Sequence, residues 1–508
     1  MLPFFFACSS QAPHDLTTAD TVLGDDTDRT TDSSPPLTLS TAGTIDHLSA
    51  LAAIAAEHDG SRHAGSSGYD ASAAYVVERL EEAGYEVVRD AFSFERFEEL
   101  SPAVLEVVDG NAYTVDADFS TMTYSGKGDV TASIEAVDVT IPPDAQSNSS
   151  TSGCEASDFA DFTAGSIALI QRGTCTFADK ARNAESAGAV GVVLFNEGQE
   201  GRQDVFASTL DPSSPATIPV VSSSYAIGEV LAAELPVTHL RVDAEITETV
   251  TENILAQTTG RDDRILVIGA HLDSVSAGAG INDNGSGSAA ILELAEELAR
   301  VEHAPLNQIR FAFWGAEELG LLGSTSYVSR LSEVERSTIL ANLNFDMIAS
   351  PNYGRFIYDG DGDPTGIAGP EGSAQIEALF VEHFERAGLA SAPTGFSGRS
   401  DYGPFIAVGI PAGGLFTGAE ARKSSQEASL FGGEADVAFD ACYHQGCDGL
   451  ENINLTGLSE MSEAAFAVAL ALADDEAPLG QASSAARPPV NLEAAMRTPE
   501  RRGKHFQR

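Results

Sequence analysis

The stretch Arg264–Arg300 restricts the fold of this chain more than any other part of the sequence. It begins with an unbroken apolar run, Ile265–Ala270, which is typical of a strand buried on both faces of a parallel sheet. His271 and Asp273 follow at once, and Asp283 comes after a glycine-rich turn, just before a segment with helical spacing of apolar residues. Ligands of open α/β sheets bind at the carboxyl ends of the strands, so these three side chains lie where chemistry is expected.

Strands and helices alternate along most of the chain and predict an α/β fold. Residues 44–95 contain two amphipathic helices, around 45–58 and 69–83, and a strand at 85–94. Between residues 250 and 473 we expect further strands at 309–314, 340–347 and 355–358, and helices at 319–331, 375–387 and 458–473. This alternation predicts a mixed, mostly parallel central sheet with helices on both faces. Residues 97–248 instead contain short β-like runs, such as 167–171, separated by Gly, Ser and Pro, which indicates a mainly-β inserted domain.

The predicted domain order follows these changes in texture. Residues 1–40 are expected to form a lipoprotein-like start and a disordered tether, and residues 41–96 the first part of the α/β domain. Residues 97–249 are the insert, residues 250–475 the main part of the α/β domain, and residues 476–508 a disordered tail. The first residues, MLPFFFACSS, resemble the end of a bacterial lipoprotein signal with Cys8 as the lipid attachment point; the alternative is a start without such a role.

The excess of acidic residues argues against nucleic acid and anionic membranes as partners. The chain has 76 acidic and 28 basic residues, a net charge of −48. Such a surface repels nucleic acid and anionic membranes. No run of about 18 apolar residues occurs after the start, so we expect no membrane span.

Five cysteines indicate an oxidising compartment outside the cytoplasm. Cys442 and Cys447 are close enough in sequence to close a short loop, and Cys154 and Cys175 to close a longer one. Sequence alone does not establish the pairing, and free thiols are the alternative.

Further side chains able to bind metal follow the other predicted strands or lie between two cysteines: Glu317, Glu318, Asp346 and His444. Each alone has a simpler interpretation, such as a structural histidine or the solvated start of a helix. Together with His271 and Asp283, they form a set of imidazole and carboxylate groups that suits borderline cations such as zinc. The set is too large for one tetrahedral ion and predicts two ions that share one carboxylate.

One acidic segment is a poorer candidate. Tyr358–Asp363 is similar to the start of a calcium-binding loop, but Pro364 and Pro370 occupy positions where that loop needs Gly and Glu. We interpret the segment as an acidic turn.

Seven blocks of the sequence resemble the secreted bacterial di-zinc leucine aminopeptidases in order and spacing. They are GAHLDS (269–274), GINDNGSGSAAILELA (280–295), FWGAEELGLLGS (313–324), NFDMIASPNYG (344–354), GRSDYGPF (398–405), GIPAGGLFTGAE (409–420) and CYHQGCD (442–448). This resemblance covers residues 44–95 and 250–473. The segment Ile167–Phe177, with Ala187–Asn196 and Ile218–Pro219, resembles the protease-associated domain, which carries no catalytic groups.

The resemblance implies a role for each ligand residue. His271 and Asp346 would hold one zinc ion, and Glu318 and His444 the other, with Asp283 between them.

The resemblance also implies roles for four further residues. Glu317 would be the general base, and Tyr443 would hydrogen-bond the developing oxyanion. Asp273 would orient His271 through its other ring nitrogen, and Arg399 would help to receive the free amino end of the substrate.

The implied protein is a secreted or envelope-attached zinc aminopeptidase with two Zn²⁺ per chain. It would release N-terminal residues, large and apolar ones by resemblance, from peptides or proteins. A carboxypeptidase or dipeptidase on the same scaffold is one alternative, and Arg399 speaks against it. A metal-free peptide-binding pseudoenzyme is another, and the complete ligand set speaks against it.

Overall fold

The computed structural model describes residues 39–199, 201–206, 208–211, 214–477 and 479–480 of the chain. The predicted lipoprotein-like start with Cys8, nearly all of the predicted tether, and the predicted tail from residue 481 lie outside these residues.

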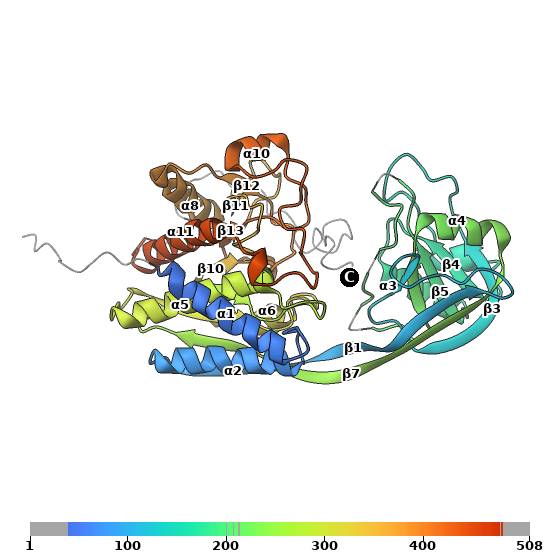
Figure 1. Ribbon diagram of the computed structural model, residues 1–508, viewed down its shortest axis with the longest axis horizontal. Helices are drawn as coiled ribbons and strands as arrows, with labels where there is room; N and C mark the ends of the chain where they lie inside the picture. Colours follow the sequence, from blue (N-terminus) through green and yellow to red (C-terminus); the bar gives the residue numbers. More distant parts are fainter. Residues whose placement is uncertain (1–38, 200, 207, 212–213, 478, 481–508) are drawn as a thin grey trace, which may run out of the picture. The chain divides into compact units, whose positions relative to one another are not determined.

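A mixed sheet forms the centre of the α/β domain (Figure 1). Its strands lie in the order β12 (Ala392–Thr394), β11 (Phe356–Tyr358), β13 (Ala412–Phe416), β10 (Ile339–Phe345), β8 (Arg261–His271), β9 (Asn307–Trp314) and β7 (Val237–Gln257). The central strands β13, β10, β8 and β9 are parallel, and their apolar runs are buried on both faces, as is typical of parallel sheets covered by helices. Strand β7 is antiparallel to β9. The predicted fold class is confirmed.

Helices cover both faces of this sheet. One face contacts α5 (Ser286–Arg300), α8 (Ser373–Ala387), α11 (Leu455–Ala473) and α2 (Ser67–Glu82), with α1 (Thr41–Glu57) packed on α5. The other face contacts α6 (Leu322–Arg330), α7 (Glu333–Thr338) and α9 (Tyr402–Ala407). Figure 1 shows α1 and α2, in blue, beside α5 in yellow-green, so the N-terminal helices complete a layer begun by helices that come much later in the sequence.

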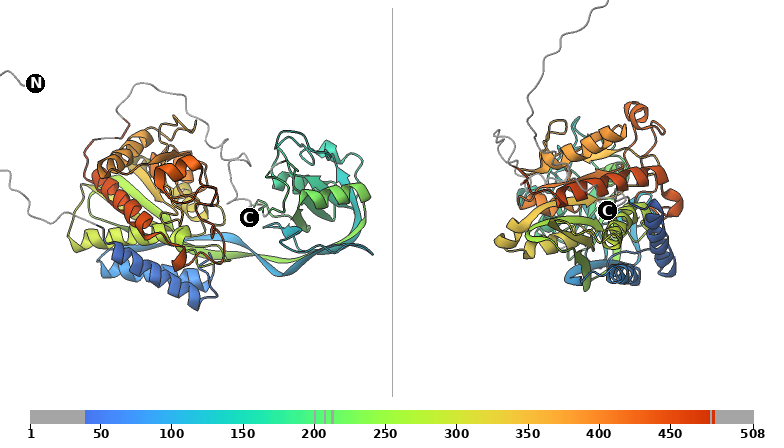
Figure 2. Two further views of the ribbon diagram at one scale, coloured as in Figure 1. Left: turned by 45° about the horizontal axis from the view of Figure 1, so that its top comes forward. Right: turned by 90° about the vertical axis from the view of Figure 1, so that its left-hand side faces the viewer.

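Two long antiparallel strands run without a break from this sheet into the insert (Figure 2). β1 (Val87–Val107) pairs with β7 along most of its length. One end of β7 pairs with β9 of the α/β domain, and the other end pairs with β3 (Gly128–Val137) of the insert. The predicted domain boundaries at residues 96/97 and 249/250 therefore fall inside continuous strands.

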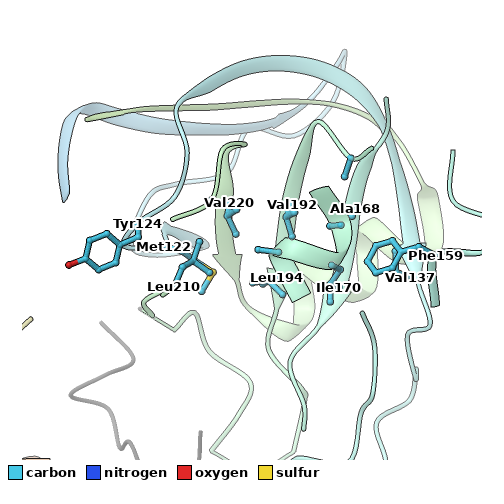
Figure 3. Close-up of a cluster of buried hydrophobic side chains, with 14 of the residues drawn as sticks. Met122, Tyr124, Val137, Phe159, Ala168, Ile170, Val192, Leu194, Leu210 and Val220 are labelled. Atoms are coloured by element: carbon cyan, nitrogen blue, oxygen red, sulfur yellow. The ribbon is translucent and has the colours of Figure 1, made fainter. Parts of the chain in front are cut away.

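The insert has its own hydrophobic core around a second set of strands. These are β3, β4 (Ile167–Gln171), β5 (Gly191–Phe195), β6 (Val220–Ser223) and β2 (Phe119–Thr121), accompanied by α3 (Phe177–Ser186), α4 (Tyr225–Glu234) and the short helix η1 (Ala156–Phe159). Figure 3 shows side chains of β4 and β5, such as Ile170 and Leu194, packed with Met122 and Phe159 in one of its clusters. The insert is therefore mainly β, as predicted.

The final helix, α11, is apolar because much of it is buried in the fold. Among the described residues, α11 is the one helix whose length and composition would allow it to cross a membrane, and 56% of the stretch concerned is buried in the fold. Met461, Ala465 and Ala469 are among its buried residues. The remaining helices are α10 (Ser425–Phe431) and the short η3 (Leu450–Asn452).

Candidate active site

The candidate ligands come from loops at one edge of the sheet. His271 ends β8, Glu317 follows β9, and Asp346 follows β10. These strands are parallel neighbours, so their carboxyl ends meet and bring the three side chains together. Asp283 lies in the turn η2 (Ile281–Gly285) that leads from β8 into α5, and His444 lies in the loop before η3.

The ligand atoms form two groups, in each of which they lie within 4.8 Å of one another: His271, Glu317 and Asp346, and Asp283, Glu318 and His444. Asp283 faces both groups. Its Oδ1 lies 3.2 Å from His271 Nε2, and its Oδ2 lies 3.2 Å from His444 Nε2. A carboxylate with one oxygen toward each of two ligand groups is placed to bridge two cations.

The remaining distances within the groups are also short. His271 Nε2 lies 3.4 Å from Asp346 Oδ1, and His444 Nε2 lies 2.9 Å from Glu318 Oε2. Glu317 Oε2 is farther away, 3.8 Å from His271 Nε2. Both Glu317 and His271 are completely buried, so the site is closed to bulk water around these two groups.

Burial and like charges perturb the ionisation of these groups strongly. Burial raises the pKa of Glu317 well above its usual value and that of Glu318 to about 7. Burial also disfavours charged His444, but the nearby carboxylates of Glu318 and Asp283 outweigh this and raise its pKa to about 10. The candidate ligands combine several buried carboxylates with two histidines, so a cation bound among them would offset negative charge.

The residues fit a pair of borderline cations. The donor set combines imidazole nitrogen with carboxylate oxygen, the combination that zinc accepts. His271 Nε2 and Asp346 Oδ1 are buried, and neither has a hydrogen-bond partner within the described ranges. Buried polar atoms without partners are costly, and a cation between them would remove that cost.

Comparison with known proteins shows the family of the chain. The model of peptidase family M28 matches residues 253–469, and the PA domain model matches residues 134–231. A curated aminopeptidase of Pseudomonas aeruginosa (strain UCBPP-PA14) is 47% identical over 435 residues, which cover 84% of this chain and 80% of that protein. The chain belongs to peptidase family M28. It is a metallo-aminopeptidase of that family.

Two further comparisons describe more distant members. A protein of Mycobacterium tuberculosis named probable lipoprotein aminopeptidase LpqL is 41% identical over 450 residues, which cover 87% of each chain. The structure of a zinc aminopeptidase from Bacillus subtilis superposes with a TM-score of 0.63 at 25% identity, covering 87% of this chain and 97% of that one.

Asp273 supports this M28 site in two ways. Its main-chain oxygen lies 3.1 Å from His271 Nδ1, whereas its carboxylate Oδ1 lies 3.8 Å away. The carboxylate instead accepts from the main-chain N–H groups of Glu317 at 3.0 Å and Glu318 at 3.3 Å. Asp273 therefore holds the turn that presents both glutamates, in addition to contacting the ring of His271.

Asp448 fixes the loop that carries Asp283 and was not expected from the sequence. Its two carboxylate oxygens accept from the main-chain N–H groups of Asn282 at 2.9 Å and Asp283 at 3.0 Å. Arg62 holds the same loop from the other side, donating to the main-chain oxygens of Ala279 and Gly280. Asp448 belongs to the CYHQGCD block and could have been suggested by it, but nothing in the sequence around Arg62 indicated this role.

The GRSDYGPF block contributes two groups that received no role from the sequence. Ser400 donates from Oγ to Asp346 Oδ2 at 2.5 Å and accepts from Asn344 at 2.7 Å. The adjacent Asp401 is completely buried, and burial raises its pKa to about 7. Ser400 thus orients one candidate ligand, and Asp401 adds to the negative charge around Glu317.

Tyr443 and Arg399 lie together at the site. Arg399 Nη2 donates to the Tyr443 hydroxyl at 3.0 Å, and its guanidinium donates to both carboxylate oxygens of Glu420 at 3.2 and 3.4 Å. The ring of Tyr443 stacks on that of His444 with 3.8 Å between centroids. Arg399 therefore positions Tyr443 and Glu420.

Both expected cysteine pairs are joined in the structure, Cys442 to Cys447 and Cys154 to Cys175. The first bridge encloses Tyr443 and His444 in a short loop. The second lies in the insert, where Cys154 is near the buried Lys180.

A small cavity of about 70 Å³ borders the ligands. Asp283, Asp346 and Tyr443 line one part of it. Its other walls include the apolar groups Met347, Tyr358, Tyr402, Phe416 and Ala419. The edge that carries the candidate ligands therefore continues into a pocket with a partly apolar lining, to which Arg399 and Ser400 also contribute.

Proposed function

We propose that this M28 aminopeptidase uses two zinc ions per chain, one held by His271 and Asp346 and the other by Glu318 and His444, with Asp283 shared. The observation that carries the proposal is the position of Asp283, with one oxygen 3.2 Å from each histidine. The zinc aminopeptidase of Bacillus subtilis, similar in fold, supports the choice of metal. When bound, such cations lower the pKa of a water molecule toward neutrality and polarise the carbonyl group of the scissile bond.

Glu317 is the proposed general base. Its carboxylate is farther from His271 than the ligand oxygens are, and it is fully buried at the same edge. It takes a proton from the attacking water and passes that proton to the leaving amine. Asp273 keeps it in place through the hydrogen bond to its main-chain N–H.

Tyr443 is the proposed donor to the oxyanion. Tyr443 lines the same cavity as Asp283 and Asp346. Because Arg399 donates to its hydroxyl, the proton of that hydroxyl can be donated to another acceptor. We keep Arg399 as a substrate-binding residue, acting through Glu420 and Tyr443. Buried carboxylates near the ions suit a cationic α-amine, which favours cleavage at the N-terminus over the carboxypeptidase alternative.

The apolar cavity is the proposed pocket for the N-terminal side chain. Met347, Phe416 and Tyr358 favour a large apolar residue over a charged one.

A panel of aminoacyl anilides tests the activity and the preference together. We expect Leu- and Phe-anilides to be cleaved faster than Lys- or Asp-anilides, and cleavage to stop with a chelator and return with zinc. An N-blocked Leu-anilide should be ignored. Cleavage of the blocked substrate would contradict the aminopeptidase assignment, and undiminished cleavage after chelation would contradict the metal.

We also propose that the protein acts outside the cytoplasm. Two disulfides fit an oxidising compartment, and the mycobacterial relative is named a lipoprotein. Labelling cells with a radioactive fatty acid tests the lipid attachment expected at Cys8, because a Cys8→Ser variant should lose the label. Equal labelling of the variant would contradict attachment at Cys8.

A further inference from the structure

A second group of metal-type ligands lies between the helices α1 and α5, outside the active site. It consists of His47 of α1 and of Glu293 and Glu296 of α5, whose ligand atoms lie within 4.8 Å of one another. We call these three residues the α1–α5 triad. Metal sites of helical bundles likewise combine two ligands at positions i and i+3 of one helix with ligands from neighbouring helices.

His47 has one occupied nitrogen and one open nitrogen. The residue is 3% exposed, and its Nδ1 lies 2.7 Å from the hydroxyl of Tyr75. Its Nε2 is buried and has no hydrogen-bond partner in the part of the chain that the structure describes. That nitrogen points between the two glutamates, 3.4 Å from Glu293 Oε2 and 3.7 Å from Glu296 Oε1.

These distances suit ligands of a shared ion better than a direct hydrogen bond. Hydrogen bonds between charged nitrogen and oxygen are about 2.7–2.9 Å long, shorter than both separations. Ligand atoms at about 2.0–2.1 Å from a tetrahedral zinc ion are about 3.4 Å from each other. The donor pair of the active site, His271 Nε2 and Asp346 Oδ1, has the same 3.4 Å separation.

The surrounding residues hold the three ligands in place. Tyr75 orients the ring of His47, as a group on the second ring nitrogen does in metal sites. Arg79 fixes Glu296, donating from Nε to Oε1 and from Nη2 to Oε2 at 2.8 Å each. Gly43 makes room for Glu293, because a Cβ at this position would come within 2.1 Å of Glu293 Oε2.

The triad is accessible from solvent. Glu293 and Glu296 line an open pocket together with Arg79, Glu82 and Ser40. The side chains of the two glutamates are 9% and 20% exposed, so an ion has a route to the buried His47.

A third group of acidic residues consists of Asp359 and Asp361, in the turn after β11, and Glu377 of α8. Its oxygens already have hydrogen-bond donors. Asp359 accepts from the main-chain N–H groups of Gly362 at 2.8 Å and Thr365 at 2.9 Å. Glu377 accepts from Gly360 at 2.8 Å and Asp361 at 3.3 Å. Main-chain donors satisfy these oxygens, and in the described part of the chain this group has no buried atom without a partner, whereas the α1–α5 triad has His47 Nε2. This agrees with our interpretation of the segment as an acidic turn.

We propose that the α1–α5 triad is a structural site for one borderline divalent cation, Zn²⁺, with water as the fourth ligand. A single imidazole with two carboxylates suits zinc better than Ca²⁺, which takes oxygen ligands only. The ion joins α1 to α5, the helix that begins directly after the turn carrying Asp283. It therefore connects the N-terminal segment to an element of the active site. A protonated His47 paired with the glutamates, without an ion, is the competing arrangement.

Metal content of the full-length protein tests the proposal. Wild type, His47→Gln and Glu293→Gln are stripped with chelator, dialysed against the same zinc solution and measured by mass spectrometry of the metal. We expect each variant to hold about one zinc ion per chain fewer than wild type while retaining aminopeptidase activity. His383→Gln, a histidine of α8 that belongs to no ligand group among the described residues, is the matched control and should bind as wild type.

Equal zinc content in wild type and both variants would overturn the proposal and favour the ion-free arrangement. Diffraction from wild-type crystals soaked in zinc, measured at the zinc absorption edge, requires no variant to fold. A peak between His47 Nε2 and the two glutamates supports the site. An empty position there, with zinc present at the active site, overturns it.

Discussion

At the residue scale, the proposed metal ligands are distinct from Glu317, the group proposed to move a proton. Glu317→Gln keeps the size of the side chain and the main-chain N–H that Asp273 binds. We expect zinc content to remain and kcat to fall by about 10²–10⁴-fold, because the amide cannot take the proton of the attacking water. Turnover with Leu-anilide and metal analysis measure the two effects. A variant with nearly full turnover would remove Glu317 from its proposed role.

Ser400 provides a second prediction at this scale. Ser400→Ala removes the hydroxyl that donates to Asp346 Oδ2 at 2.5 Å. We expect zinc affinity to fall by about 10–100-fold, since partners of ligand carboxylates contribute on this scale. Titration with a competing chelator measures the change. Ser397→Ala is the matched control, because Ser397 contacts the hydroxyl of Tyr402. The same chelator sensitivity in Ser400→Ala and wild type would refute the role.

The candidate site residues were easier to predict from the sequence than the residues that hold them in place. His271, Asp283, Glu317, Glu318, Asp346 and His444 follow predicted strands or lie in family-like blocks, and the structure brings them together. Asp448, Ser400 and Arg62 could not be derived in the same way. Their contacts join residues more than fifty positions apart, so they depend on tertiary packing that periodicity does not describe.

At the element scale, the loop closed by Cys442–Cys447 carries both Tyr443 and His444. Opening the bridge gives that loop more conformations. Metal binding must then also restrict the loop around His444, which costs conformational entropy and weakens binding. We expect a Cys442→Ser/Cys447→Ser variant to lose zinc from the His444 side at lower chelator concentration than wild type. A Cys154→Ser/Cys175→Ser variant, altered in the insert, is the control. Equal zinc retention by the first variant and wild type would contradict this role of the loop.

The buried Lys180 of α3 gives the insert a pH dependence. Its Nζ donates to the main-chain oxygen of Ser152, and burial lowers its pKa from 10.5 to about 8. Between about pH 8 and pH 10.5 the lysine is protonated in the unfolded chain but not in the folded chain, so the free energy of unfolding rises with pH in this window. Below about pH 8 the folded chain holds the charged lysine, and the full cost of burying that charge lowers its stability.

We expect the unfolding free energy of wild type to gain up to about 1 kcal/mol per pH unit over this window relative to Lys180→Met. Calorimetry of both proteins at several pH values measures the difference. Lys127→Met, which alters an exposed lysine, should follow wild type. Parallel curves for Lys180→Met and wild type would show that Lys180 does not titrate as described.

Element boundaries were predictable where a strand or helix is short and buried. The expected strand 167–171 coincides with β4, and its five residues are all buried. The expected strand 85–94 was too short. Strand β1 continues past residue 94 to Val107, and this additional part also pairs with β7. Much of this ribbon is exposed on at least one side, so it lacks the apolar run by which a buried strand is found.

At the scale of the whole molecule, the net charge of −48 opposes folding. Like charges on a compact surface repel one another more than in the extended chain, and salt screens this repulsion over about 10 Å at 0.1 M and about 3 Å at 1 M. We expect the Tm to rise by several degrees on adding NaCl, and less in a neutral solute of equal osmolality. A Tm that falls with NaCl would show that attractive ion pairs outweigh the repulsion.

The proposed mechanism depends on two cations that share Asp283. Diffraction from zinc-soaked crystals, measured above and below the zinc absorption edge, can locate both ions. We expect two anomalous peaks about 3.5–4 Å apart, one beside His271 and Asp346 and one beside Glu318 and His444, both in contact with the carboxylate of Asp283. A single peak at this edge of the sheet, or two peaks that do not share Asp283, would contradict it.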